Sequence, residues 1–153
     1  MPCAAPRPPC PPCRRGLTLI ELLIGIAIAA VLAALSYPAY QSAILTLRRG
    51  EALTLLAQCQ LAQERHRSNH PAFATLAQLG IPTLSPSGRY LLSETPPGPG
   101  GYSLHATAQG AQAADARCRH LRLQVEGLQT TWASGPDSTV GNTDRDNRRC
   151  WGR

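Results

Sequence analysis

Residues 14–40 read RRGLTLIELLIGIAIAAVLAALSYPAY, and this stretch decides what kind of fold the chain can have. Between Leu17 and Leu47 the only charged side chain is that of Glu21. A helix over residues 17–40 would be about 36 Å long, which is enough to cross a hydrocarbon layer of ~30 Å. The stretch therefore predicts a membrane-spanning helix. Glu21 is its anomaly, because a carboxylate inside a span is costly unless it is neutralised or paired.

Residues 1–16, MPCAAPRPPCPPCRRG, have a different character. Their six prolines exclude a regular helix. No apolar run precedes Gly16, so this is not an ordinary secretory signal with its cleavage site after an apolar core. The segment holds a CPPC pattern, but no histidine or fourth cysteine lies nearby, and we assign these cysteines no metal or redox role.

The composition agrees with a small domain that carries an apolar appendage. The chain has 153 residues, of which 43% are hydrophobic and 16% are charged. The charged fraction is below the ~25% of an ordinary soluble protein, which indicates that one stretch avoids water. The chain is also too short for most catalytic α/β folds, which need several βαβ units.

The helical pattern continues well beyond the apolar stretch. Alanine and leucine remain frequent to about Ser68, and Asn69 with Pro71 then supplies a stop. We expect one helix over about residues 17–68, kinked at Pro38, which lacks a backbone donor. One face of its second half should pack under a sheet, and Cys59 on this face is expected to be a buried thiol: Ala52, Leu55, Leu56, Cys59, Ala62 and Gln63. The charged residues Glu51, Glu64, Arg65 and Arg67 are expected to face solvent.

The rest of the chain predicts a small antiparallel sheet. Apolar and polar residues alternate over 102–107 and 120–126, and two weaker candidates are 89–94 and 128–132. Gly127 marks a tight hairpin turn between the last two strands. Residues 69–88 and the polar tail from Ser134 are expected to be loops. The predicted fold class is therefore α+β, with one long helix packed on about four strands.

The sequence RRG-LTLIELLIG resembles the signal of type IV prepilins and pseudopilins. The matching features are the basic leader ending in Gly16, the Thr18-Leu19 pair and the glutamate at Glu21, the fifth mature residue. The resemblance implies cleavage after Gly16 by a prepilin peptidase and N-methylation of Leu17, where the family usually has phenylalanine. It also implies that Pro38 kinks the helix and that the fold is that of a type IV pilin. The implied organisation is a leader (1–16), a helix half in the membrane or filament core (17–40), and a periplasmic or extracellular head (41–153).

Cleavage gives Glu21 a physical role. It creates an α-amino group at Leu17, four residues before Glu21 and on the same helix face. In a bundle of such helices, the carboxylate of one subunit can neutralise the amine of its neighbour, and two charges that are costly alone become tolerable together. We therefore expect Glu21 to select the register of assembly.

The C-terminal half resembles minor pilins of the PilE type, through YSLHATAQGAQAADARC, LRLQVEG and the final Cys150-Trp151. The resemblance implies a disulfide between Cys118 and Cys150 that closes the C-terminal loop. It implies a subunit that is anchored in the inner membrane and then assembled with other pilins into an extracellular pilus. The expected processes are pilus biogenesis, twitching motility and adhesion.

Arginines flank both cysteines of the expected disulfide. Arg117 and Arg119 surround Cys118, while Arg148 and Arg149 precede Cys150 and Trp151. Such a cluster can neutralise phosphates, and a tryptophan can stack on a base, which motivates a DNA-binding hypothesis. PilE-like minor pilins are also similar to ComP, a pilin that acts as a DNA-uptake receptor. The alternative, which the sequence favours, is a mixed polar surface in which these arginines pair with Asp115, Asp144 and Asp146.

Two other patterns provide weaker evidence for a functional site. His66 and His70 have the i, i+4 spacing of zinc ligands without a third ligand, and Asn142, Asp144 and Asp146 begin a calcium-loop pattern that is not completed. No residue has a recognisable catalytic setting. We therefore expect a minor pilin with no enzymatic activity, no cofactor and no metal. The alternatives are a DNA-uptake pilin and a pseudopilin of a type II secretion system.

Overall fold

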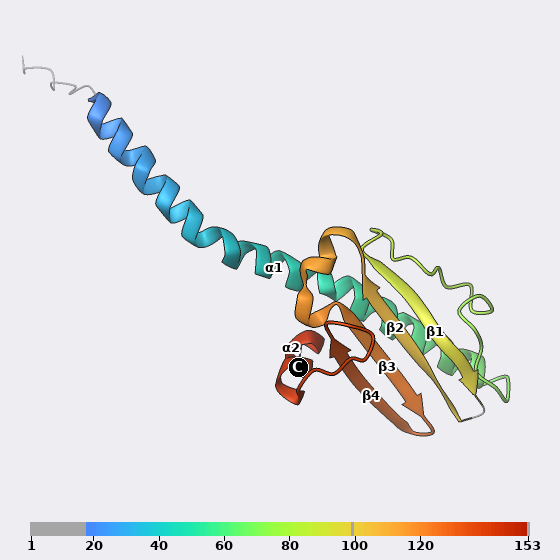
Figure 1. Ribbon diagram of the computed structural model, residues 1–153. Helices are drawn as coiled ribbons and strands as arrows, with labels where there is room; N and C mark the ends of the chain where they lie inside the picture. The colour runs from blue at the N-terminus through green and yellow to red at the C-terminus, as the bar shows by residue number, and fades with distance from the viewer. Residues whose placement is uncertain (1–17, 99, 153) are drawn as a thin grey trace, which may run out of the picture. The chain divides into compact units, whose positions relative to one another are not determined.

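The computed structural model describes residues 18–98 and 100–152 (Figure 1). Gly16, Leu17 and the expected leader lie outside the described residues. The chain contains the following elements: α1 (Leu19–Arg67), β1 (Tyr90–Gly98), β2 (Gly101–Ala108), the short 3-10 helices η1 (Gly110–Ala114) and η2 (Ala116–Cys118), β3 (His120–Glu126), β4 (Gln129–Gly135) and α2 (Asp144–Trp151). They confirm the predicted type IV pilin fold, in which one long helix precedes a four-stranded antiparallel sheet.

The chain divides into two compact units, one ending at Pro38 and the other beginning at Ala39. In the first unit, every described residue of α1 is exposed, including Leu19, Leu22 and Ile26. Helix α1 is long and apolar enough to cross a membrane by length and composition. Pro38 lies inside α1, and its expected kink stays a prediction.

The second unit contains the sheet, with strand order β1-β2-β3-β4 and every neighbouring pair antiparallel. Buried and half-exposed residues alternate along β2 and β3, as the sequence pattern predicted. The last expected strand begins one residue later than predicted, because Leu128 occupies the hairpin turn and is fully exposed. Strand β4 also extends to Gly135, so part of the expected C-terminal loop is strand.

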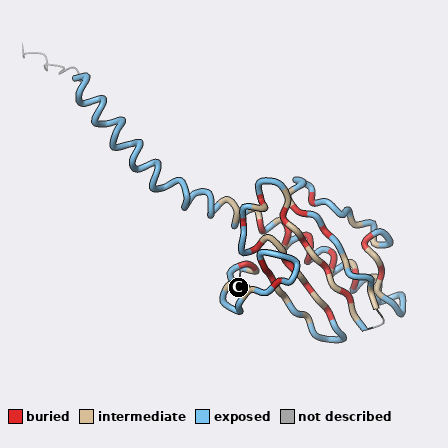
Figure 2. Tube along the Cα trace, in the orientation of Figure 1, coloured by how far each residue is buried: buried red, intermediate tan, exposed pale blue. Residues whose placement is uncertain are grey.

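The core of this unit lies between the second half of α1 and one face of the sheet. Figure 2 shows the buried residues along the strands and along this part of the helix. The predicted helix face is confirmed at Ala52, Leu55, Leu56, Cys59 and Gln63, whereas Ala62 is only half-buried. Cys59 is a free, fully buried cysteine, and burial raises its pKa to about 11, so it remains a protonated thiol in the core.

Polar side chains fasten the segment between α1 and β1 to the core. The amide of the buried Gln63 donates to the carbonyl of Ala74 at 2.6 Å and accepts from the Ala74 N–H at 3.0 Å. The Glu94 carboxylate accepts from the N–H of Leu76 at 2.9 and 3.0 Å. These bonds satisfy backbone groups of an irregular segment that no ladder could satisfy.

Glu51 differs from the expectation that it faces solvent freely. Its carboxylate accepts from the backbone N–H and the hydroxyl of Ser87 and lies 3.2 Å from Arg89. Burial acts to raise the pKa of this carboxyl, but the hydrogen bonds from Ser87 and Arg89 outweigh it and lower the pKa to about 2. Glu51 therefore joins α1 to the start of β1.

This arrangement predicts acid sensitivity of the head. The contribution of Glu51 is complete above its ordinary pKa of 4.5 and is lost as the pH falls toward about 2. Because the carboxylate is near the surface, we expect a loss of only roughly 1–2 kcal/mol in the free energy of unfolding. The fluorescence of Trp132 and Trp151, followed during urea unfolding in detergent micelles, measures it. Glu51→Gln should remove the pH dependence that Glu51 causes, and an unchanged acid profile in that variant would contradict the assignment.

Candidate functional site

The predicted disulfide residues and the arginines that flank them lie in the second unit. Cys118 and Cys150 are bonded, with their Cα atoms 5.5 Å apart, so the predicted pairing is confirmed. The bond joins η2 to α2, a short helix within the C-terminal segment that was expected to be loop throughout. The loop prediction was wrong here because DRDNRRCW is too polar to show an apolar face on its own.

Capping explains why so polar a segment is helical. The Thr143 hydroxyl accepts from the N–H of Asp146 at the start of α2, and Gly152 ends the helix in the left-handed conformation. Asp144 and Asp146 lie in the first turn and Arg148 with Arg149 in the last, which complements the helix dipole. Thr143, Asp146 and Gly152 were the sequence signals that could have revealed α2.

Helix α2 is held against β4 by three side-chain bonds. The Asn147 amide donates to the Trp132 carbonyl at 2.6 Å and accepts from the Ser134 hydroxyl at 2.8 Å. The indole N–H of Trp151 donates to the Ala133 carbonyl at 3.2 Å, and its half-buried ring packs against the core. Trp151 therefore has a structural role, and only part of its surface is open to a ligand.

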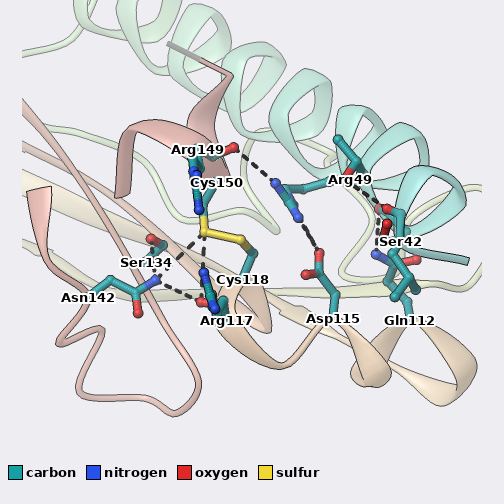
Figure 3. Close-up of polar contacts among 12 residues, drawn as sticks. Ser42, Arg49, Gln112, Asp115, Arg117, Cys118, Ser134, Asn142, Arg149 and Cys150 are labelled. Carbon is teal, nitrogen blue, oxygen red and sulfur yellow. Dashed lines mark hydrogen bonds and ion pairs between the residues drawn. A yellow bond between two sulfur atoms is a disulfide. The ribbon is translucent and has the colours of Figure 1, made fainter. Parts of the chain in front are cut away.

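Asn142 closes the loop between β4 and α2 onto the disulfide region. Its amide donates to the Arg117 carbonyl at 2.7 Å and to the Ser134 hydroxyl at 3.0 Å (Figure 3). Its amide nitrogen is thus committed to the fold. The Asp146 carboxylate accepts from Thr143 and faces Arg117, so two residues of the incomplete calcium-loop pattern, Asn142 and Asp146, have other partners here.

A buried ion pair links this region to α1. The Arg49 guanidinium donates to the Asp115 carboxylate through two nitrogens at 2.9 and 2.8 Å, and to the Arg149 carbonyl at 3.1 Å (Figure 3). Both charged side chains are no more than 10% exposed. Gln112 adds a bond to the Leu45 carbonyl at 3.0 Å. Because Arg49 lies beside Arg48 in a polar run, nothing in the sequence indicated that its side chain would be buried.

This ion pair changes the expected charge balance around the disulfide. Asp115 pairs with Arg49 and not with the flanking arginines. Among residues 18–98 and 100–152, Asp146 pairs with Arg117 at 3.3 Å, and Asp144 forms no ion pair. The mixed surface that the sequence favoured is therefore less neutral than expected.

We name the arginines around the disulfide the arginine cluster: Arg117, Arg119, Arg145, Arg148 and Arg149. All are exposed except Arg119, which is half-buried and donates to the Ala113 carbonyl at 3.0 Å. In the described part of the chain, Arg117 alone of the five forms an ion pair, and its side chain is still 69% exposed. The cluster is thus a set of largely accessible cations on a backbone fixed by the disulfide.

The histidines do not add to the positive charge of the arginine cluster. His66 and His70 stack with ring centroids 4.0 Å apart. His120, next to Arg119, has its pKa lowered by burial and by that guanidinium, and the pKa of His105 is lowered by burial and by Arg122. At neutral pH the positive charge of this region therefore comes from arginine.

In the first unit, Glu21 lies in the first turn of α1. Its backbone N–H donates to the Thr18 hydroxyl at 3.3 Å, so Thr18 serves as a helix cap. Among residues 18–98 and 100–152, the Glu21 carboxylate has no ion-pair partner.

The long α1, the four-stranded antiparallel sheet and the disulfide in the C-terminal region define a type IV pilin. Residues 38–122 match the family model described as type IV minor pilin ComP, DNA uptake sequence receptor, and residues 12–37 match the prokaryotic N-terminal methylation motif. The first match covers more than half of the chain. The protein therefore belongs to the family of ComP-type type IV minor pilins.

A curated relative agrees with this assignment. A fimbrial protein of Moraxella nonliquefaciens is 43% identical over 61 residues, which is 40% of this chain and 40% of that protein. The alignment thus spans well under half of the relative. Pilin families consist of structural, non-enzymatic proteins.

Proposed function

We propose that this minor pilin is cleaved after Gly16 by a prepilin peptidase and methylated on the amine of Leu17. Residues 1–16 are then a leader, residues 17–40 anchor the subunit in the inner membrane and later enter the filament core, and residues 41–153 form the head. The observation that supports this is the continuous exposed apolar surface of α1, which lies almost entirely within the matched methylation motif at residues 12–37. In water that surface would be strongly unfavourable, whereas lipid or neighbouring helices would cover it.

Assembly then depends on Glu21. In the filament core, its carboxylate neutralises the Leu17 amine of a neighbouring subunit. Both charges are therefore compensated in only one register of the two helices. The mature subunit takes part in pilus biogenesis, twitching motility and adhesion. A secretion pseudopilin is disfavoured by the match to a minor pilin family and to a fimbrial protein. Loss of secreted enzymes with intact motility in a deletion strain would reverse that preference.

We further propose that the head binds the DNA backbone through the arginine cluster, in support of DNA uptake. The match to a family named for a DNA uptake sequence receptor supports this, as does the single ion pair among five clustered arginines. Guanidinium groups bind phosphate oxygens at two points, and each contact releases counterions. The disulfide and the Arg49–Asp115 pair fix the backbone that carries these groups.

A gel-shift titration tests the DNA proposal. We expect the variant with both Arg148→Ala and Arg149→Ala to bind duplex DNA about tenfold more weakly at low salt. The slope of log Kd against the logarithm of the salt concentration should also be smaller by about 2 for this variant, because two phosphate contacts are lost. The Arg49 bond to residue 149 uses the backbone carbonyl, so the substitution leaves that bond possible.

The matched control removes the same charge elsewhere. Arg65→Ala with Arg67→Ala alters two exposed arginines at the end of α1 and should leave the affinity within about twofold. Salt-independent binding, or equal losses in the two double variants, would exclude the arginine cluster as the DNA interface.

A further inference from the structure

An open cavity of about 580 Å³ lies beside the disulfide and shares Arg117 and Arg149 with the arginine cluster. Its walls come from α1 (Ser42, Leu45, Thr46, Arg49), from residues 114–118, and from Asp146, Arg149 and Cys150 of the α2 region. Figure 3 shows Ser42, Arg49, Asp115, Arg117 and Arg149 arranged around this region. The proposed DNA interface shares Arg117 and Arg149 but assigns no ligand to the interior of the cavity.

The charges of the cavity favour a small anion. Arg49 and Asp115 neutralise one another in its wall, at no more than 10% exposure. Arg117 and Asp146 form a second pair at 3.3 Å, but the Arg117 side chain is 69% exposed. Arg149 is exposed and adds a positive charge that these pairs do not balance. The lining thus carries a net charge of +1, from three arginines and two aspartates.

The position of the cavity along α1 indicates the source of the anion. Ser42, Leu45 and Thr46 follow the end of the apolar stretch at Tyr40 by two to six residues, which is about 3–9 Å along a helix. All of these residues belong to the same compact unit as the cavity. The headgroup layer on each side of a bilayer is about 5–8 Å thick. When Tyr40 lies at the edge of the hydrocarbon, the cavity is therefore at the depth of the lipid phosphates.

We propose that this cavity binds the phosphate of an anionic phospholipid headgroup while the pilin is anchored in the membrane. The inference rests on the proposed anchoring by residues 17–40. Arg149 and the outward-facing Arg117 contact the phosphate oxygens, and Leu45 with Ala114 and Ala116 lies against the glycerol. A zwitterionic headgroup binds less well because its own amine neutralises the phosphate. Duplex DNA is far too wide to enter a cavity of this size, whereas a single headgroup is small enough, although Arg117 and Arg149 belong both to the cavity and to the arginine cluster.

Amide hydrogen exchange of the mature chain in nanodiscs tests the proposal. Discs of phosphatidylcholine are compared with discs that also contain phosphatidylglycerol. We expect exchange over residues 114–118 to be at least about fivefold slower with phosphatidylglycerol, the factor that one arginine near an anionic surface supplies. In the variant with Arg117→Gln and Arg149→Gln, this difference should fall below about twofold.

Two further variants separate the cavity from general charge. Arg65→Gln with Arg67→Gln removes two arginines about 38 Å further along α1 than Tyr40 and should keep the difference. Asp146→Asn releases Arg117 from its ion pair and should increase the difference, a gain of protection that misfolding does not give. Unchanged exchange over residues 121–125 shows that each variant retains its sheet.

Several results would overturn the proposal. These are equal exchange in the two kinds of disc, a preserved difference in the Arg117 and Arg149 variant, or the same protection from inorganic phosphate added to phosphatidylcholine discs. If the chain fails to co-elute with either kind of disc, the anchoring itself is wrong and the headgroup site falls with it. A chain that inserts equally into both discs but shows no difference leaves the anchoring intact.

Discussion

Substitution of Glu21 by alanine is expected to leave the precursor cleavable but to reduce the amount of this subunit in filaments at least about tenfold. In the assembly proposed above, the variant removes one partner of a charge pair and leaves the Leu17 amine of a neighbour uncompensated. Removing one partner of a buried pair costs roughly 3–5 kcal/mol, which is more than a tenfold change in an equilibrium. Immunoblots of sheared filaments and of the cell envelope measure the two effects separately.

The control for this experiment lies in the same exposed apolar segment. Ser36 donates its hydroxyl to the Leu32 carbonyl and carries no charge, so Ser36→Ala should be incorporated as the wild type is. Because both variants keep the residues on either side of the proposed cleavage site, both should also be processed. Normal incorporation of Glu21→Ala would contradict the role of charge pairing in selecting the register.

Removal of the disulfide, by Cys118→Ser with Cys150→Ser, is expected to lower the free energy of unfolding of the head by roughly 3–4 kcal/mol. The two cysteines are 32 residues apart, and the cross-link restricts that loop in the unfolded chain. The loss should also loosen the arginine cluster and weaken DNA binding, since η2 and α2 are then joined only by weaker contacts. Urea unfolding in micelles, followed by tryptophan fluorescence, measures the stability.

Cys59 provides the control for the disulfide. Cys59→Ala removes a buried free thiol without breaking a cross-link, so we expect it to cost only about 1 kcal/mol and to leave DNA binding unchanged. A doubly substituted chain as stable as the wild type, or an equally large loss in Cys59→Ala, would contradict the stabilising role of the Cys118–Cys150 bond.

The parts of the fold that could be predicted from the sequence are those with a strong periodic signal. The helix over Leu19–Arg67 follows from the apolar stretch and from the alanine and leucine residues that recur beyond it up to Asn69 and Pro71. Strands β2 and β3 follow from strict alternation, because one face of each packs on α1. The boundaries of β1 and β4 were less accurate, since a proline pair in β1 and a fully exposed Leu128 beside β4 obscure the alternation.

The parts that could not be predicted depend on contacts between distant segments. Helix α2 is stabilised by its caps and by the hydrogen bonds of Asn147 and Trp151 to β4. These contacts stabilise the helix although its sequence is mostly polar. Burial of Arg49 depends on Asp115, 66 residues away, and the hydrogen bonds of the Glu51 carboxylate depend on Ser87. In each case a polar residue finds its partner only after the chain has folded.

For the candidate site, the arginines and the disulfide could be predicted from the sequence, but the acidic partners of the arginines could not. It placed two arginine pairs at the expected disulfide, and the bond between Cys118 and Cys150 does join the two segments. It did not reveal that Asp115 would be taken by Arg49, which leaves most of the cluster without acidic partners among the described residues. Nor could it reveal that Trp151 would dock on the core.

The most direct test of the minor-pilin assignment is quantitative mass spectrometry of sheared, purified surface filaments. We predict a peptide that begins at N-methyl-Leu17 and a disulfide-linked peptide containing Cys118 and Cys150, both at a small fraction of the main pilin. Finding the processed chain only in the cell envelope, with filaments free of it, would contradict the account and would favour a secretion pseudopilin or an assembly factor that does not reach the surface.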